Sequence, residues 1–189
     1  LLIYLLLTFR YISREKYFRR LYILPVLFLS WGNMHPGVIT GLIVLFIFLL
    51  SEFLACKFPA KFGSKDQIAI SADNLKRLAI ISVVSVLVLF LNPHGINTYL
   101  YAYEHTNMKM LENIAEWISP FSDKINSTFV ITLYKVSLIA SLIVLYCAYR
   151  KKDLLLGMLT IFFGVYSVTA IRFTADFELI AIPLLIICT

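Results

Sequence analysis

The chain has 189 residues, of which 60% are apolar and only 15% are charged, and its formal net charge is +6. A water-soluble domain contains about half apolar residues and about a quarter charged ones, so this composition excludes an ordinary soluble domain. The charges cluster between long apolar runs, and a helix needs about 20 apolar residues to cross a bilayer. The sequence therefore predicts an all-α, polytopic membrane protein, and its basic residues do not indicate a nucleic-acid partner.

Seven apolar segments follow one another along the chain, and each is expected to be helical because backbone polar groups cannot stay unpaired in lipid. They are 1–9, 21–34, 38–56, 78–92, 129–149, 154–171 and 177–189. The first and the last are too short to cross alone, and we expect them to be truncated spans of a longer polypeptide. The prediction is one transmembrane domain over 1–189, a helix bundle of about five complete or near-complete spans plus two truncated ones. The second and fourth segments are short for full crossings.

The loops between these segments differ strongly in charge. Of the 17 Lys and Arg residues, 13 lie in the loops 10–20, 57–77 and 150–152, which share one side if the chain crosses at every segment. Because excess Lys and Arg marks the cytoplasmic side, these loops are predicted to be cytoplasmic, and the long loop 93–128 is predicted to lie outside. Apolar residues recur at helical spacing over 100–118, and we expect an interfacial helix there.

Polar residues gather at the predicted outer helix ends, and all three histidines are among them. Asn33 and His35 follow the second segment, and Asn92 and His94 follow the fourth, each pair beside a Pro and a Gly that stop the helix. Two interpretations are open. These side chains either cap helix ends in interfacial water, or they face a shared cavity, where a histidine donates hydrogen bonds to a phosphate or transfers a proton near neutral pH.

Two further residues complete the candidate site. Glu116 precedes Trp117 in the outer loop and is either a solvated carboxylate or a group that binds a sugar hydroxyl or a cation. Arg172 is either a helix-end arginine paired with the acidic residues that follow it, or a clamp on a lipid-linked phosphate, which suits its planar geometry. The histidine spacing does not support a metal site, and no catalytic residue or cofactor is assigned. The predicted substrate-binding residues are Asn33, His35, Asn92, His94, Glu116 and Arg172.

Four short segments occur in a characteristic order. Residues 31–37 read W-G-N-M-H-P-G, residues 91–95 read L-N-P-H-G, residues 114–120 read I-A-E-W-I-S-P, and Arg172 follows. This order resembles W-x-N-x-H-G-G, L-N-P-Y-G, I-x-E-W-x-S-P and R-H-x-P-like segments of bacterial multi-spanning proteins in the glycosyltransferase C superfamily, of the family 39 and aminoarabinose transferase type. Pro36 replaces a Gly of that pattern, His94 replaces an aromatic residue, and Phe173 replaces a His.

The resemblance implies transfer of a sugar from a polyprenyl-phosphate donor at the extracytoplasmic face of a bacterial plasma membrane. It implies that the catalytic base is an Asp in the first outer loop, which is expected to lie upstream of Leu1. Phe173 weakens the comparison at the segment that begins with Arg172.

Two other classes of function fit the same residues. A transporter or flippase for a lipid-linked or amphipathic substrate would use a polar cavity without making bonds. Buried charges along the whole depth of the bundle and broken spans would favour it. A non-catalytic membrane scaffold would be favoured if the histidines and Arg172 point apart. All three hypotheses have membrane lipids as partners, and the first adds the polyprenyl-phosphate sugar.

Overall fold

The computed structural model describes residues 1–35, 37–65, 69–106, 111, 114–126 and 128–188. All seven predicted segments lie in helices, and no strand occurs within these described ranges. The chain divides into two compact units, Leu1–His105 and Thr106–Thr189. Each unit is described by itself, and a single domain over the whole chain stays a prediction.

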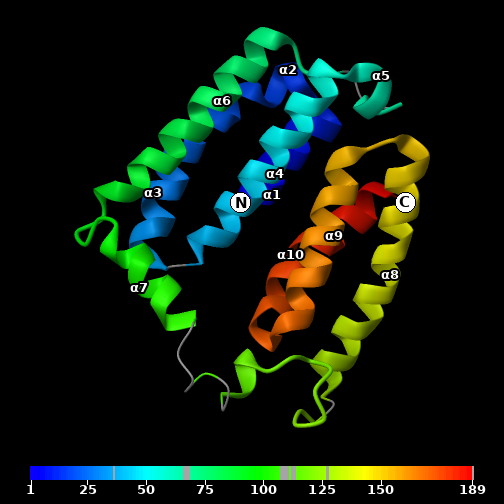
Figure 1. Cartoon of the computed structure of the whole chain (residues 1–189). Coiled ribbons are helices and arrows are strands. Elements are labelled where there is room, and N and C mark those ends of the chain that lie inside the picture. The colour runs from blue at the N-terminus through cyan, green and yellow to red at the C-terminus, as the bar shows by residue number, and fades with distance from the viewer. Residues whose placement is uncertain (36, 66–68, 107–110, 112–113, 127, 189) are drawn as a thin grey trace. The chain divides into compact units, whose positions relative to one another are not determined.

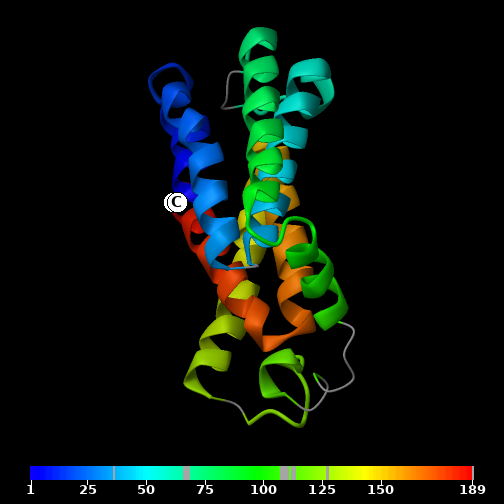
Figure 2. The same ribbon diagram turned by 90° about the vertical axis from the view of Figure 1, so that its left-hand side faces the viewer.

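Unit 1 is built on three helices that pack against one another, and a shorter helical segment precedes them in the chain (Figure 1). The three are α3 (Leu24–Met34), α4 (Val38–Lys57) and α6 (Ala72–Leu87). The chain enters through α1 (Leu2–Leu7) and a π-helical turn (Thr8–Ile12), and then reverses direction at α2 (Arg14–Tyr17) and a 3-10 segment (Phe18–Ile23) (Figure 2). The short helix α5 (Pro59–Phe62) follows α4. The two basic loops of unit 1 therefore lie at the same end of its helices.

The fourth predicted segment forms a longer helix than its apolar run indicates. The hydroxyl of Ser71 accepts a hydrogen bond from the backbone N–H of Asn74 at 3.3 Å and caps the helix, which begins at Ala72. A 3-10 segment (Val88–Leu91) extends α6 at its other end. The apolar run itself is short, and the cap adds to the helix the polar residues that precede the run, so that Ala72–Leu91 is long enough to cross a membrane.

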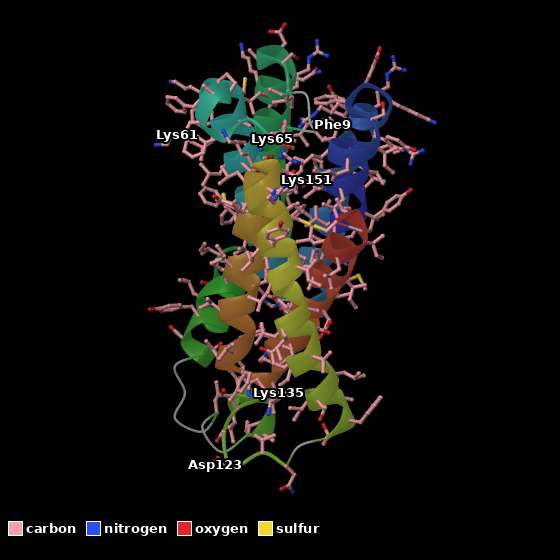
Figure 3. All side chains as sticks on the ribbon, turned by 90° about the vertical axis from the view of Figure 1, so that its right-hand side faces the viewer. Phe9, Lys61, Lys65, Asp123, Lys135 and Lys151 are labelled. Carbon is pink, nitrogen blue, oxygen red and sulfur yellow. The ribbon has the colours of Figure 1, made fainter. Side chains whose placement is uncertain are left out.

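Unit 2 is a bundle of three helices in pairwise contact, α8 (Phe129–Lys151), α9 (Leu154–Thr169) and α10 (Thr174–Cys188) (Figure 1). The turn between α8 and α9 is tight, with Lys152 in the left-handed region at φ 54°. The buried carboxylate of Asp153 accepts a hydrogen bond from the backbone N–H of Leu155 at 3.1 Å, which caps α9. Figure 3 shows Lys151 at one end of α8, and Lys135 and Asp123 toward the other.

Among the described residues, three helical stretches are long and apolar enough to cross a membrane: Val38–Lys57, Ala72–Leu91 and Phe129–Lys151. A helix of 20 residues is about 30 Å long, which matches the hydrocarbon thickness of a bilayer. Apolar side chains of α8 are exposed along its length, at Val130, Leu133, Val136, Ile139, Leu142 and Ile143. An apolar surface of this extent is typical of contact with lipid, and the combination indicates a membrane protein.

The described part of the loop 93–128 includes a helix, α7 (Asn97–Thr106), and a 3-10 turn (Ala115–Trp117). Ile114 and Ile118 have extended backbone conformations, so the helical spacing does not continue through 118 as predicted. The backbone carbonyl of Ile118 instead accepts a hydrogen bond from the N–H of Ile171 at 3.0 Å. Pro36 and residues 107–110 and 112–113 lie outside the described residues.

The packing of Gly41 in α4 gives a test of this fold. A Cβ atom at Gly41 would lie 2.5 Å from the rigid indole ring of Trp31, whereas a Cβ at Gly157 in α9 would meet its nearest atom at 3.8 Å. Gly41→Ala is expected to lower the free energy of unfolding by roughly 1–3 kcal/mol. Gly157→Ala is expected to raise it by about 0.5–1 kcal/mol, since alanine favours a helix. Thermal unfolding of the purified protein measures both, and equal midpoints would contradict the packing of α3 on α4.

Candidate functional site

Two segments of the resemblance meet at one end of unit 2. Besides the hydrogen bond between Ile171 and Ile118, the hydroxyl of Ser119 donates a hydrogen bond to the backbone carbonyl of Val168 at 2.8 Å. These contacts fasten the outer loop to the turn between α9 and α10. They bring Glu116 and Arg172, which are 56 positions apart in the sequence, to the same place.

Arg172 lies between an aromatic ring and a carboxylate. The central carbon of its guanidinium is 4.1 Å from the centre of the Trp117 ring, and its Nη1 atom is 3.9 Å from Oε1 of Glu116. The two charged side chains are 34% and 57% exposed. An exposed ion pair contributes about 0–1 kcal/mol, and an exposed cation–π contact contributes about 0.5–1 kcal/mol. Arg172 is therefore accessible and only loosely held, and it contacts an outer-loop carboxylate, a pairing that neither interpretation of Arg172 from the sequence includes.

Aromatic rings line the other side of this arginine. Phe173 stacks on Tyr166 with 4.0 Å between ring centres. It also makes an edge-to-face contact with Trp117, with 6.1 Å between ring centres. The position at which the resemblance expects His is thus an apolar ring packed against two neighbours. Residue 173 has no proton to transfer, and it adds an apolar surface beside Arg172.

In unit 1, the predicted residues after α3 make local hydrogen bonds. The side-chain amide of Asn33 donates to the backbone carbonyl of Leu29 at 2.7 Å. Nδ1 of His35 accepts a hydrogen bond from the backbone N–H of Gly37 at 2.8 Å. Both side chains are exposed. The helix-capping interpretation accounts for these contacts. They involve Nδ1 of His35 and not its other ring nitrogen, Nε2.

Asn92 organises the turn after α6 in the same way. Its amide donates to the carbonyls of Leu89 at 2.8 Å and Gly95 at 3.0 Å, and its Oδ1 accepts from the backbone N–H of His94 at 2.8 Å. Gly95 has φ +54°, a conformation that glycine adopts without strain. Asn92 is buried and His94 is exposed. Asn92 therefore acts in the structure as a helix stop, and its amide donors are already used.

The ends of α3 and α6 are packed together through a third residue from α7. A Cβ atom at Gly32 would lie 2.6 Å from the side chain of Leu89 and 3.2 Å from the Tyr99 hydroxyl. That hydroxyl donates a hydrogen bond to the Leu89 carbonyl at 3.1 Å, and burial raises the pKa of Tyr99, so the donor proton is retained at neutral pH. The first two segments of the resemblance therefore also meet, at one end of unit 1.

The six predicted residues thus fall into two groups. Asn33, His35, Asn92 and His94 belong to unit 1, and Glu116 and Arg172 belong to unit 2. The structure brings Glu116 to Arg172, while a single pocket shared by all six residues stays a prediction. Within the described part of the chain, no group of three or more His, Cys, Asp or Glu side chains is arranged to hold a metal ion.

The sequence analysis missed a buried ion cluster at the basic end of unit 1. Glu52 of α4 is fully buried and forms a salt bridge with Arg10, whose side chain is 2% exposed. Arg14 binds the same carboxylate with two N–H groups, from Nη1 to Oε2 at 2.5 Å and from Nη2 to Oε1 at 3.1 Å. The signal was present, because a Glu inside a 20-residue apolar helix needs a partner. The charge of the loops predicts for Arg10 and Arg14 a cytoplasmic location and contact with anionic lipid headgroups, and it does not predict their buried partner.

Comparisons with known proteins assign the chain to no family. No family model, no curated protein and no solved structure matches it. The likeness to the glycosyltransferase C superfamily therefore rests on four short segments, and the contacts within each unit are described without reference to any relative.

The buried cluster predicts a large effect of one substitution. Glu52→Ala leaves the buried guanidinium of Arg10 and the partly exposed one of Arg14 without their shared carboxylate, and removing one partner of a buried pair costs roughly 3–5 kcal/mol of stability. Glu15 is a matched control, since it is exposed and lies on the neighbouring helix α2. Glu15→Ala is expected to change stability by less than about 0.5 kcal/mol. Thermal unfolding compares the two variants, and similar midpoints would show that Glu52 does not hold the arginines.

Proposed function

We propose that the chain is part of an integral membrane glycosyltransferase that takes its sugar from a polyprenyl-phosphate donor. The observation that carries this proposal is the exposed guanidinium of Arg172, held loosely beside Trp117 and Glu116 at the end of unit 2 away from Lys151. A mobile cation between an aromatic ring and a carboxylate is suited to a ligand that combines a phosphate with a sugar. The order of the four segments supports the same class.

The proposal includes the placement of the chain in the membrane. About five of its seven apolar segments cross completely or nearly so, and the loops 10–20, 57–77 and 150–152 face the cytoplasm of a bacterial cell. The loop 93–128 lies at the extracytoplasmic face, with α7 in the plane of the interface. The sugar donor then meets Arg172 on that face.

In the proposed reaction, the bond between the sugar C1 and the phosphate oxygen breaks, and its electron pair stays on the phosphate. The acceptor hydroxyl oxygen forms the new bond to C1 and gives its proton to a base that is not assigned here. Arg172 stabilises the charge that develops on the leaving phosphate through charge-assisted hydrogen bonds. Glu116 orients sugar hydroxyls. His35 and His94 are further candidates for phosphate contact, whereas Asn33 and Asn92 contribute less because their amides cap helices.

Substitution of Arg172 tests this assignment in the full-length protein, reconstituted with a polyprenyl-phosphate sugar and an acceptor. Arg172→Ala is expected to lower the release of polyprenyl phosphate about 100-fold, the usual effect of losing one donor to a developing oxyanion. Arg172→Lys keeps the charge but not the planar fork and is expected to be intermediate. Lys124→Ala is the matched control, an exposed cation of the same outer loop. Unchanged turnover in Arg172→Ala would remove the clamp from the mechanism.

A flippase is the second candidate, and one observation favours it. The Arg10–Glu52 pair places buried charge at the basic end of unit 1, so polar groups are not confined to the ends that carry the histidines. Vesicles that contain a fluorescent polyprenyl-phosphate lipid separate the two functions. Movement of intact lipid between leaflets without release of sugar would support the flippase, and sugar transfer without such movement would support the enzyme.

Reporter fusions test the proposed orientation. Green fluorescent protein is expected to fluoresce when fused after Lys152, because this loop is cytoplasmic in the proposal, and to stay dark when fused after Asp123, where it would be exported through the general secretion pathway. Alkaline phosphatase fused at the same positions should give the opposite pattern. Fluorescence after Asp123 would reverse the orientation and move Arg172 away from an extracytoplasmic donor.

A further inference from the structure

The ion cluster of Arg10, Arg14 and Glu52 carries more positive than negative charge. Two guanidinium groups, which stay protonated in proteins, share one carboxylate, so the cluster has a net charge of +1. Its surroundings are apolar, because Phe9 packs against Phe18 and Phe48 with ring centres 5.7 and 6.2 Å apart, and all three are buried. The carbonyl ends of the Thr8–Ile12 turn and of α4 offset part of this charge. A positive charge in such surroundings favours binding of an anion.

Arg14 is the member of the cluster that an anion reaches. Its side chain is 17% exposed, whereas those of Arg10 and Glu52 are 2% and 0% exposed. Each of its two terminal nitrogens gives one N–H to Glu52, and its buried Nε has no hydrogen-bond partner among the described residues. One face of the guanidinium lies over the Phe9 ring at 5.4 Å. Glu52 therefore fixes the orientation of Arg14 without using all of its donors.

The surface around this cluster is strongly basic. Ten Lys and Arg residues stand against four acidic residues when the loops 10–20 and 57–77 are taken together with Glu52. Figure 3 shows Lys61 and Lys65 at the same end of unit 1 as Phe9. Juxtamembrane basic groups attract anionic lipid, by about 1 kcal/mol for each Lys or Arg near the surface. The basic loops concentrate anionic headgroups where Arg14 reaches the surface.

We propose that Arg14, oriented by Glu52 and supported by Arg10, binds the phosphate of an anionic lipid headgroup at the basic end of unit 1. The phosphate accepts charge-assisted hydrogen bonds from Arg14 and neutralises the excess charge of the cluster. A lipid is the occupant that fits, because Arg10 and Glu52 lie near the ends of apolar helical segments, at the level where lipid headgroups meet the hydrocarbon layer. This site depends on the membrane location but not on glycosyl transfer, so it stands or falls separately from Arg172.

Lipid-dependent stability of the whole chain in a neutral detergent tests this site. Phosphatidylglycerol at about 100 times its dissociation constant is expected to raise the midpoint of thermal unfolding by roughly 5–10 °C. Phosphatidylcholine, whose phosphate is neutralised by its own choline, is expected to raise it by less than about 2 °C. Inorganic phosphate is the third probe. If inorganic phosphate alone raised the midpoint as much as phosphatidylglycerol does, a lipid would be ruled out as the occupant.

Two variants assign the lipid effect to a residue. Arg14→Gln keeps the Arg10–Glu52 salt bridge and removes the exposed cation, so the shift caused by phosphatidylglycerol should fall to about that of phosphatidylcholine. Arg20→Gln is the matched control, because Arg20 is an exposed arginine of the same loop that lies over the Tyr17 ring, and it should keep most of the shift. The readout is the difference with and without lipid, so a lower basal midpoint does not obscure it. An unchanged shift in Arg14→Gln, or an equal loss in Arg20→Gln, would overturn the site.

Discussion

The structure depends on one constraint: in an apolar surrounding, backbone N–H and C=O groups must pair within the chain. The long helices of both units satisfy it internally, and their apolar side chains make no competing hydrogen bonds. Only the first and last turns of each helix leave backbone groups unpaired within the helix. Ser71, Thr128 and Asp153 accept hydrogen bonds from N–H groups at helix starts, and Asn33 and Asn92 donate to carbonyls at helix ends. Polar residues therefore gather at helix ends for structural reasons before any function is considered.

This constraint separates two kinds of polar residue. Asn92 is buried and uses both its amide donors and its carbonyl oxygen on the turn that it closes, so it has little capacity left for a ligand. Arg172 is exposed, and its contacts with Trp117 and Glu116 are weak enough to be exchanged. Both residues belong to the segments that carry the resemblance. The hydrogen bonds of Asn92 show that it stabilises the fold, whereas the weak contacts of Arg172 leave its guanidinium available to a ligand.

Much of the helical fold was predictable because its signal is local. Apolar runs and the stop residues at 32–37 and 92–95 gave the seven segments, and the structure places all of them in helices. Errors arose where a distant partner decides the local structure. The helix expected over 100–118 does not continue to 118, where the Ile118 carbonyl pairs with the N–H of Ile171. Glu116 and Arg172 were chosen individually, but their contact depends on a loop closure that spacing does not reveal.

Glu52 shows why the charged clusters were harder to predict than the helices. Counting Lys and Arg by loop treats each charge as exposed, and it therefore assigns Arg10 and Arg14 a role in topology and in contact with lipid headgroups, but no partner within the fold. In the structure the chain reverses at α2, and this reversal carries both arginines to a carboxylate about 40 positions away.

Arg10 and Arg172 have the same side chain, but the free energies of their two ion pairs differ because one pair is buried and the other is exposed. In the buried pair, loss of the partner leaves a charge without solvent, so the contact is permanent. In the exposed pair, water and Glu116 compete for Arg172 on nearly equal terms, so the contact is readily exchanged. Burial, rather than residue type, determines which arginine of this protein is fixed within the fold and which keeps an exposed, exchangeable contact.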